Sequence, residues 1–285
     1  MKRIILAPNP TGTGHNMRML TIGKEILKRC PDDKLIVLLG SMQDVFTPLF
    51  KEAGIKIIDL SPTGIIDYSV SSHLEMKLDW NTMIKNYFVP TFFNGDKILR
   101  YVDIFVKEQA DMVISDYNIN AAIAAILNGT RNVFVTERHN FTLVDVEEND
   151  LIGGGFDVNK DEIRAAKKSL NHVFDWMMQN TDLIITDKPY VEKMDKGKLM
   201  ERYFQIGKAH FVGPIYAPRE GNELVWEDYG IDISKPYIVG TVSGTTMIKE
   251  DRDKNIQIYT DVYKEVRKKF LIYSSYYWAT LKFRR

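Results

Sequence analysis

Short aliphatic runs that alternate with helical patterns restrict the fold of this sequence more than any other feature. The runs are rich in Ile, Val and Leu and lie at residues 3–7, 34–39, 56–60, 111–115, 132–136 and 182–186. Continuous apolar strands separated by helices are typical of a parallel sheet that helices cover on both faces. The sequence therefore predicts an α/β fold built on a Rossmann-like parallel sheet.

The helical patterns between these runs are expected to pack on the sheet. The pattern at 16–30 places one set of residues on a single helix face, which predicts a buried thiol at its end: Met19, Ile22, Gly23, Ile26, Leu27 and Cys30. Residues 118–128 are mostly Ala and Ile and end in an Asn-Gly turn, which indicates a helix buried against its strand. In the pattern at 161–179 we interpret Trp176 and the two methionines after it as core residues.

A polar, charged segment at 217–232 separates a strand pattern at 210–213 from a new one at 237–241. We place the domain boundary there, which gives an N-terminal domain at 1–216 and a linker with a second Rossmann-like domain at 217–285. Domains of this class usually contain about 100–150 residues, so the second domain is expected to be truncated.

Composition and charge exclude several classes of function. The chain has 285 residues, 45% of them hydrophobic, and its 38 basic and 38 acidic residues balance. This charge balance argues against a nucleic-acid partner. One cysteine and histidines without ligand spacing argue against a disulfide or a metal site, and no cofactor is expected. Because no signal peptide and no run of about 18 apolar residues is present, we expect a cytoplasmic protein.

The glycine turn at Gly12, Thr13 and Gly14 lies between the first strand and the first helix and is the segment most informative about function. At a helix N-terminus, backbone N–H groups and the helix dipole favour an anion or a polarised oxygen. Glycine lets a ligand approach the backbone closely. We therefore expect these three residues to contact substrate.

Two common nucleotide-binding motifs do not fit this turn. A dinucleotide fingerprint would need a small residue where Met17 stands, and an acidic residue at the end of the second strand, where Leu39, Gly40 and Ser41 follow one another. The phosphate-binding loop of nucleoside triphosphatases would need Ser or Thr in place of Glu25. NAD binding and triphosphate hydrolysis are therefore not expected.

His15 is expected in the first turn of the helix that begins at this edge of the sheet. The positive helix end disfavours an imidazolium ring there, which favours the neutral form that a general base needs. Asp116 ends a later strand and would reach the same edge, where the active sites of open α/β sheets lie. We predict a catalytic pair of His15 and Asp116. The alternative is that His15 only begins its helix and that Asp116 caps the helix after it.

Further polar residues are expected to bind substrate at that edge. Glu137, Arg138 and His139 follow an aliphatic run, where they would meet phosphate or a sugar hydroxyl; a solvated loop is the alternative. Arg18 lies about one helical turn after the glycine turn, which predicts either a substrate contact or a surface ion pair.

An aromatic segment flanks Pro90, with Tyr87, Phe88, Phe92 and Phe93. We interpret these residues as core, with an acceptor groove or a peripheral membrane contact as the alternatives. The membrane alternative would place the protein at the inner face of the membrane.

The segment 12–20, Gly-Thr-Gly-His-Asn-Met-Arg-Met-Leu, resembles the Gly-x-Gly-His-x-x-Arg-x-Leu loop of one branch of the glycosyltransferase-B superfamily. That branch includes the peptidoglycan N-acetylglucosaminyltransferase, related archaeal and bacterial glycosyltransferases and the UDP-sugar hydrolase of pseudaminic acid synthesis. Segments 113–123, 181–187 and 211–215 resemble it as well.

The resemblance implies a hexosyltransferase of cell-envelope glycan synthesis in which His15 acts as base and Asp116 orients it. It implies a nucleotide-sugar donor, a UDP-sugar, and a sugar, lipid-linked or small-molecule acceptor. It also implies that a turn in the second domain contacts the donor phosphate, although the commoner family form has two glycines there: Ser243, Gly244, Thr245 and Thr246. Hydrolysis of a nucleotide-sugar and a non-catalytic, truncated binding protein are the alternatives.

Overall fold

In the computed structural model, the described residues are 1–10, 13–60, 93–136, 159–216, 232, 234, 238–242, 249–266, 270–274 and 281–282. They belong to two compact units, which are described separately below. The first includes the elements up to Tyr216, and the second includes the elements from Ile238 onward. The linker predicted at 217–232 lies almost entirely outside the described residues, so the boundary stays a prediction.

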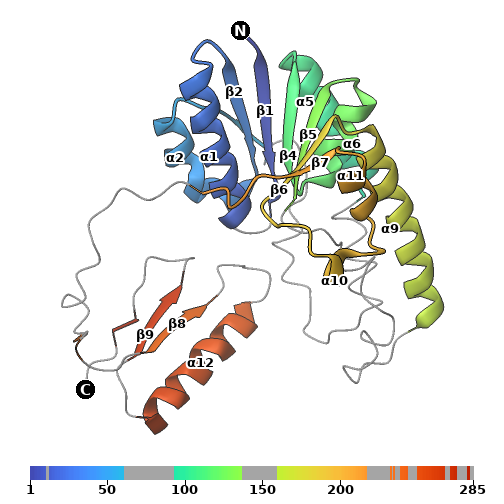
Figure 1. Ribbon diagram of the computed structural model, residues 1–285. Coiled ribbons are helices and arrows are strands. Elements are labelled where there is room, and N and C mark those ends of the chain that lie inside the picture. Colours follow the sequence, from blue (N-terminus) through green and yellow to red (C-terminus); the bar gives the residue numbers. More distant parts are fainter. Residues whose placement is uncertain are drawn as a thin grey trace. The chain divides into compact units, whose positions relative to one another are not determined.

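The first unit is built on a seven-stranded sheet in the order β3-β2-β1-β4-β5-β6-β7 (Figure 1). The strands are β1 (Arg3–Pro8), β2 (Lys34–Leu39), β3 (Lys56–Asp59), β4 (Met112–Asp116), β5 (Arg131–Thr136), β6 (Leu183–Thr186) and β7 (Ala209–Phe211). All neighbouring strands pair in parallel. The α/β fold and its parallel sheet are confirmed, and each aliphatic run forms a strand.

Helices cover both faces of this sheet. The helices are α1 (Thr13–Arg29), the 3-10 helix η1 (Ser41–Phe46), α2 (Thr47–Glu52), α5 (Gly95–Lys107), α6 (Ile119–Leu127), α9 (Lys160–Asn180), α10 (Glu192–Asp195) and α11 (Glu201–Gln205). Strand side chains alternate between the two faces. Leu6 therefore lies in a core completed by α1 and α2, whereas Ile5 lies in a core completed by α5, α6 and α9.

The local sequence of α6 explains its burial and the residues at which it begins and ends. All its residues from Ile119 to Ala125 are buried, as its Ala and Ile content predicts. The Asn118 side chain caps the helix by accepting from the Ala121 N–H at 3.1 Å. Gly129 follows the C-cap with a φ of 68°, in the left-handed region that glycine adopts at little cost.

Two sequence expectations about burial are wrong. Cys30 is exposed, because α1 ends at Arg29 and the chain turns there toward β2. Trp176 is 41% exposed, whereas Met177 and Met178 are fully buried as predicted. The buried side of α9 follows a spacing of three and four residues, which leaves Trp176 on its flank.

The second unit contains β8 (Ile238–Val242), α12 (Lys249–Val266), β9 (Phe270–Ser274) and β10 (Leu281–Lys282). β8 pairs with β9 in parallel, and β10 pairs with β9 antiparallel. The order β8-α12-β9 is one βαβ unit, the repeating element of Rossmann-like folds.

Gly23 lets α1 approach the sheet closely. A Cβ built on it would lie 2.8 Å from Cδ1 of Ile55 and 3.0 Å from Cδ1 of Leu6. Both neighbours belong to the core under α1. A larger residue at this position would therefore push apart an already close-packed layer.

We predict that Gly23→Val destabilises the fold by about 2 kcal/mol, because its added methyl groups overpack the space under α1. Gly95→Val is the matched control, since a Cβ at this other helical glycine meets nothing within 4 Å. It should change the free energy of unfolding by no more than about 0.5 kcal/mol. Urea unfolding of both variants measures the difference, and equal losses would contradict the close packing of α1.

Candidate active site

The carboxyl ends of β1 and β4 lie side by side where the connections of the sheet change direction. Pro8 pairs with Asp116 in the β1–β4 register, and the Asn9 N–H donates to the Asp116 carbonyl at 2.9 Å. β1 leads through α1 to β2 on one side, whereas β4 leads through α6 to β5 on the other. In open α/β sheets, ligands bind at such a junction.

The first turn of α1 begins directly after β1. It contains Thr13 and Gly14 and carries no acidic residue. A Cβ built on Gly14 meets nothing within 4 Å, so packing does not require glycine at this position. The N-terminal end of α1 adds positive potential to this edge of the sheet.

His15 and Asp116 meet at this junction. His15 Nδ1 lies 3.0 Å from Asp116 Oδ1, the Asp116 side chain is fully buried, and the His15 side chain is 10% exposed. The structure therefore brings together the two side chains that the sequence analysis pairs. The capping alternative for Asp116 is wrong, because Asn118 is the N-cap of α6.

Arg18 completes a buried cluster with this pair. Its Nε donates to Asp116 Oδ2 at 2.7 Å, and its Nη2 donates to Asp116 Oδ1 at 3.0 Å. The ion pair is buried, with 7% of the Arg18 side chain exposed, so the alternative of a surface ion pair is wrong. Such a two-point contact fixes the plane of the carboxylate as well as its position.

Two groups contact Nδ1 of His15. Arg18 Nη2 lies 3.1 Å from it, so Nδ1, Nη2 and Asp116 Oδ1 form a nearly equilateral triangle. Nε2, the other ring nitrogen, makes no hydrogen bond to any described residue.

Tyr117 orients the His15 ring, and the sequence analysis missed it. The two rings stack with centroids 6.2 Å apart and an angle of 13° between their planes. Tyr117 in turn stacks on Phe134 of β5. Its φ of 51° lies in the left-handed region, which a tyrosine rarely adopts, and Asn9 Nδ2 donates to its carbonyl at 2.8 Å. The only sequence signal was an aromatic residue directly after Asp116.

Asp187 is a second carboxylate at this edge that the sequence analysis did not select. It follows β6, and its Oδ2 lies 3.5 Å from Arg18 Nη1 and 3.8 Å from Lys188 Nζ. Within the described ranges, its buried Oδ1 has no hydrogen-bond partner. The available signal was its position at the end of an aliphatic run, the same signal that identified Asp116.

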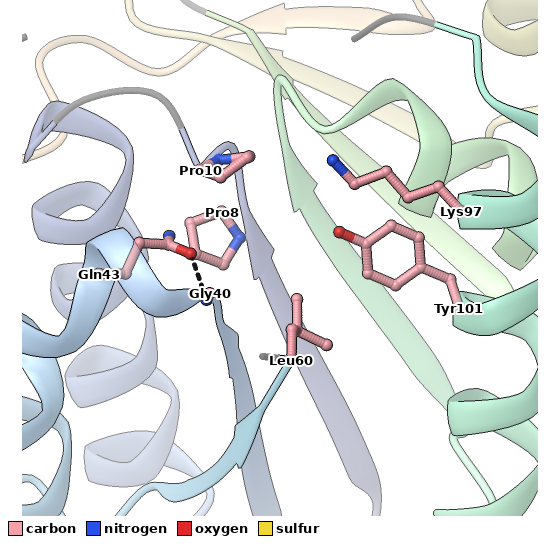
Figure 2. Close-up of a pocket in the computed structure, with 7 residues that line it drawn as sticks. All are labelled: Pro8, Pro10, Gly40, Gln43, Leu60, Lys97 and Tyr101. Atoms are coloured by element: carbon pink, nitrogen blue, oxygen red, sulfur yellow. Dashed lines mark hydrogen bonds between the residues drawn. The ribbon is translucent and has the colours of Figure 1, made fainter. Parts of the chain in front are cut away.

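A small pocket, partly open to solvent, lies at the ends of β1, β2 and β3 (Figure 2). Its lining residues are Pro8, Pro10, Gly40, Gln43, Leu60, Lys97 and Tyr101. Neither His15 nor Asp116 lines this pocket. Asn118 links it to their strand ends, because its Nδ2 donates to the Pro8 carbonyl at 3.2 Å and to the Tyr101 hydroxyl at 3.1 Å.

Several predicted site residues lie outside the described part of the chain: Gly12, Glu137, Arg138, His139, Ser243, Gly244, Thr245 and Thr246. Of the aromatic segment around Pro90, only Phe93 is described, and it is 47% exposed. Within the described ranges, no group of three or more His, Cys, Asp or Glu side chains is arranged to hold a metal ion. No helix in those ranges is long and apolar enough to span a membrane.

Comparisons with known proteins identify the fold through structure alone. No family model and no curated protein matches the sequence. Medicago truncatula UGT71G1, solved in complex with UDP-glucose, is 15% identical, with a TM-score of 0.58 over 96% of this chain and 66% of its own. The glycosyltransferase SnogD from Streptomyces nogalater is 13% identical, with a TM-score of 0.54 over 97% of this chain and 67% of its own.

An enzyme of another class shares the fold. A Listeria monocytogenes protein assigned as a UDP-N-acetylglucosamine 2-epimerase is 8% identical, with a TM-score of 0.53 over 95% of this chain and 62% of its own. The chain thus spans about two thirds of the length of these structures. At these identities the likeness shows that the chain shares its fold with these structures.

Proposed function

We propose that this chain belongs to a glycosyltransferase that moves a sugar from a UDP-sugar to an acceptor hydroxyl, with His15 as the general base. The observation that supports this most is the buried contact of His15 Nδ1 with Asp116 at the β1–β4 junction. We assign the Nδ1 proton to the contact with Asp116, which makes Nε2 the basic nitrogen. A general base needs such an oriented, unprotonated nitrogen.

The proposed reaction follows from this arrangement. His15 Nε2 takes the proton of the acceptor hydroxyl while the acceptor oxygen attacks the anomeric carbon of the donor sugar. The bond from that carbon to the diphosphate breaks, and UDP leaves with the electron pair. Asp116 accepts a hydrogen bond from Nδ1–H throughout the reaction and stabilises the imidazolium that forms. The first-turn backbone N–H groups of α1, including those of Thr13 and Gly14, interact with the developing negative charge.

We propose that Arg18 positions the base and does not bind the substrate. Its Nε and Nη2 are both used by Asp116, and its Nη1 faces Asp187. This replaces the direct substrate contact that the sequence analysis considered. We retain Glu137, Arg138 and His139 as proposed substrate contacts, because β5 ends beside the strand that carries Asp116.

The donor class rests on the fold and on the resemblance of the glycine turn. The Medicago truncatula structure contains UDP-glucose, a nucleotide-sugar. We propose that the donor diphosphate meets the second unit after β8, at Ser243, Gly244, Thr245 and Thr246.

We predict that His15→Ala lowers the rate of UDP release from UDP-glucose or UDP-N-acetylglucosamine by about 10²–10⁴-fold, because the proton acceptor is lost. His172→Ala is the matched control, since His172 is an exposed histidine on α9, and it should leave the rate unchanged. The measurement is UDP release by the purified chain, with and without a panel of alcohol and sugar acceptors.

The outcomes of this assay separate the proposed reaction from its alternatives. Release that requires an acceptor and depends on His15 supports the transferase. Release that depends on His15 but needs no acceptor identifies hydrolysis of the nucleotide-sugar. Equal rates for the native chain and His15→Ala would contradict the role of His15 as base.

Stability should respond differently to the two members of the pair. Asp116→Asn leaves the Arg18 guanidinium buried with its main carboxylate partner removed, so we predict a loss of about 3–5 kcal/mol in the free energy of unfolding. His15→Ala keeps the Arg18–Asp116 ion pair and should cost only about 1 kcal/mol. Denaturant unfolding of both variants gives the comparison, and similar losses would show that the ion pair is not the main support of the cluster.

A further inference from the structure

Groups of positive and negative charge surround the His15 ring. Arg18 Nη2 lies 3.1 Å from His15 Nδ1, and the N-terminal end of α1 is also positive. Both disfavour a positive charge on the ring. Asp116 opposes them, but the same carboxylate is already the main partner of Arg18. A base in this position takes up a proton more readily when a second negative charge lies nearby.

Asp187 supplies such a charge. Its Oδ2 lies 3.5 Å from Arg18 Nη1, on the side of the guanidinium away from Asp116. The Asp187 side chain is 16% exposed, so water screens this charge only partly. Among the described residues, the other charged or titratable groups of the cluster are Asp116 on β4, Arg18 on α1 and the stacked Tyr117, with Lys188 beside Asp187.

Two aspartates at the opposite edge of the sheet, where strands begin, hold neighbouring strands together. Asp182, which precedes β6, accepts from the Asn132 N–H at 2.7 Å, and Asp111, which precedes β4, accepts from the Arg3 N–H at 2.7 Å. Asp187, which follows β6, makes charge contacts with Arg18 and Lys188 instead, and among the described residues its buried Oδ1 has no hydrogen-bond partner. A buried oxygen without a hydrogen bond costs stability, so local structure alone does not explain an aspartate there.

The local backbone holds Asp187 at this place. The Lys188 N–H donates to the Thr186 hydroxyl at 3.1 Å, which bends the chain directly after β6. β6 lies two strands from β4 in the sheet. Arg18 therefore extends across the end of β5, from the carboxylate of Asp116 to that of Asp187.

We propose that Asp187 is a positioning residue for His15: it offsets the charge of Arg18 and so allows the ring to accept a proton beside that cation. The inference rests on the proposed function of His15 as a base. With His15 neutral, the formal charges of His15, Arg18, Asp116 and Asp187 sum to −1, and they sum to zero when His15 takes the acceptor proton. Lys188 adds a positive charge beside Asp187, but its side chain is 58% exposed, so solvent screens it more than it screens these four groups. Asp187 touches neither substrate nor the reacting atoms in this role.

The test measures how much of His15 is protonated in the full chain without any substrate. The chain is labelled with ¹⁵N-histidine, and the ring nitrogens of His15 are assigned by their loss in His15→Gln. At the pH where native His15 is half protonated, Asp187→Asn should lower the protonated fraction at least about threefold, because one nearby negative charge is removed. Asp187→Glu, which keeps the charge, should restore most of it.

Asp195→Asn is the matched control. Asp195 is also buried, but its side chain accepts from the Val191 N–H at 2.7 Å on α10. This variant should lose stability without changing the protonated fraction of His15. If Asp187→Asn does not fold, Asp187→Glu and Asp187→Gln form a second pair of nearly equal size that differs in charge.

Unchanged protonation of His15 in Asp187→Asn, or an equal change in Asp195→Asn, would overturn the role of Asp187. The measurement needs no turnover, so its result is independent of the assay for UDP release. If His15→Ala loses activity but Asp187→Asn leaves His15 protonation unchanged, the positioning role fails and the proposed function stands. If the protonated fraction falls as expected but His15→Ala keeps its activity, the proposed function fails alone.

Discussion

The two-point ion pair between Arg18 and Asp116 is the interaction on which the candidate site depends. It joins the first helix to the end of β4, across nearly one hundred residues of sequence, and it lies in a fully buried position. A carboxylate buried at that depth is stable only with a charged or hydrogen-bonding partner. Because Arg18 holds both oxygens of Asp116, the carboxylate has a fixed orientation toward His15. Asp116 Oδ1 then lies 3.0 Å from Nδ1 of His15.

The sheet supplies the rest of the geometry. The pairing of Pro8 with Asp116 places the start of α1 beside the end of β4, and Gly23 lets α1 lie close to the strands. Tyr117 then stacks on the His15 ring. A register shift of one residue along β1 would turn its own side chains, such as Leu6 under α1, to the other face of the sheet. The fold thus fixes the position of His15, as its proposed role as a base requires.

Most of the fold and part of the site could be predicted from the sequence, for definite physical reasons. Aliphatic runs and their order specify a parallel sheet, and strand-end rules place His15 and Asp116 at one edge. The burial of Arg18 and the ring stack of Tyr117 depend on side-chain directions in space, which no local pattern encodes. Asp187, like Asp116, directly follows an aliphatic run in the sequence. Its position beside Arg18, however, depends on the place of β6 in the sheet. The exposure of Cys30 depends on the residue at which α1 ends. Hydrophobic periodicity predicts that a helix is present more accurately than it predicts where the helix ends.

A crystal structure of the chain with UDP and an acceptor alcohol that supports turnover tests the assignment of His15 as the base most directly. We predict that the acceptor oxygen lies within about 3.2 Å of His15 Nε2, with His15 Nδ1 still hydrogen-bonded to Asp116. An acceptor oxygen bound elsewhere, or an Nε2 occupied by a protein group in that complex, would contradict the assignment of His15 as the base.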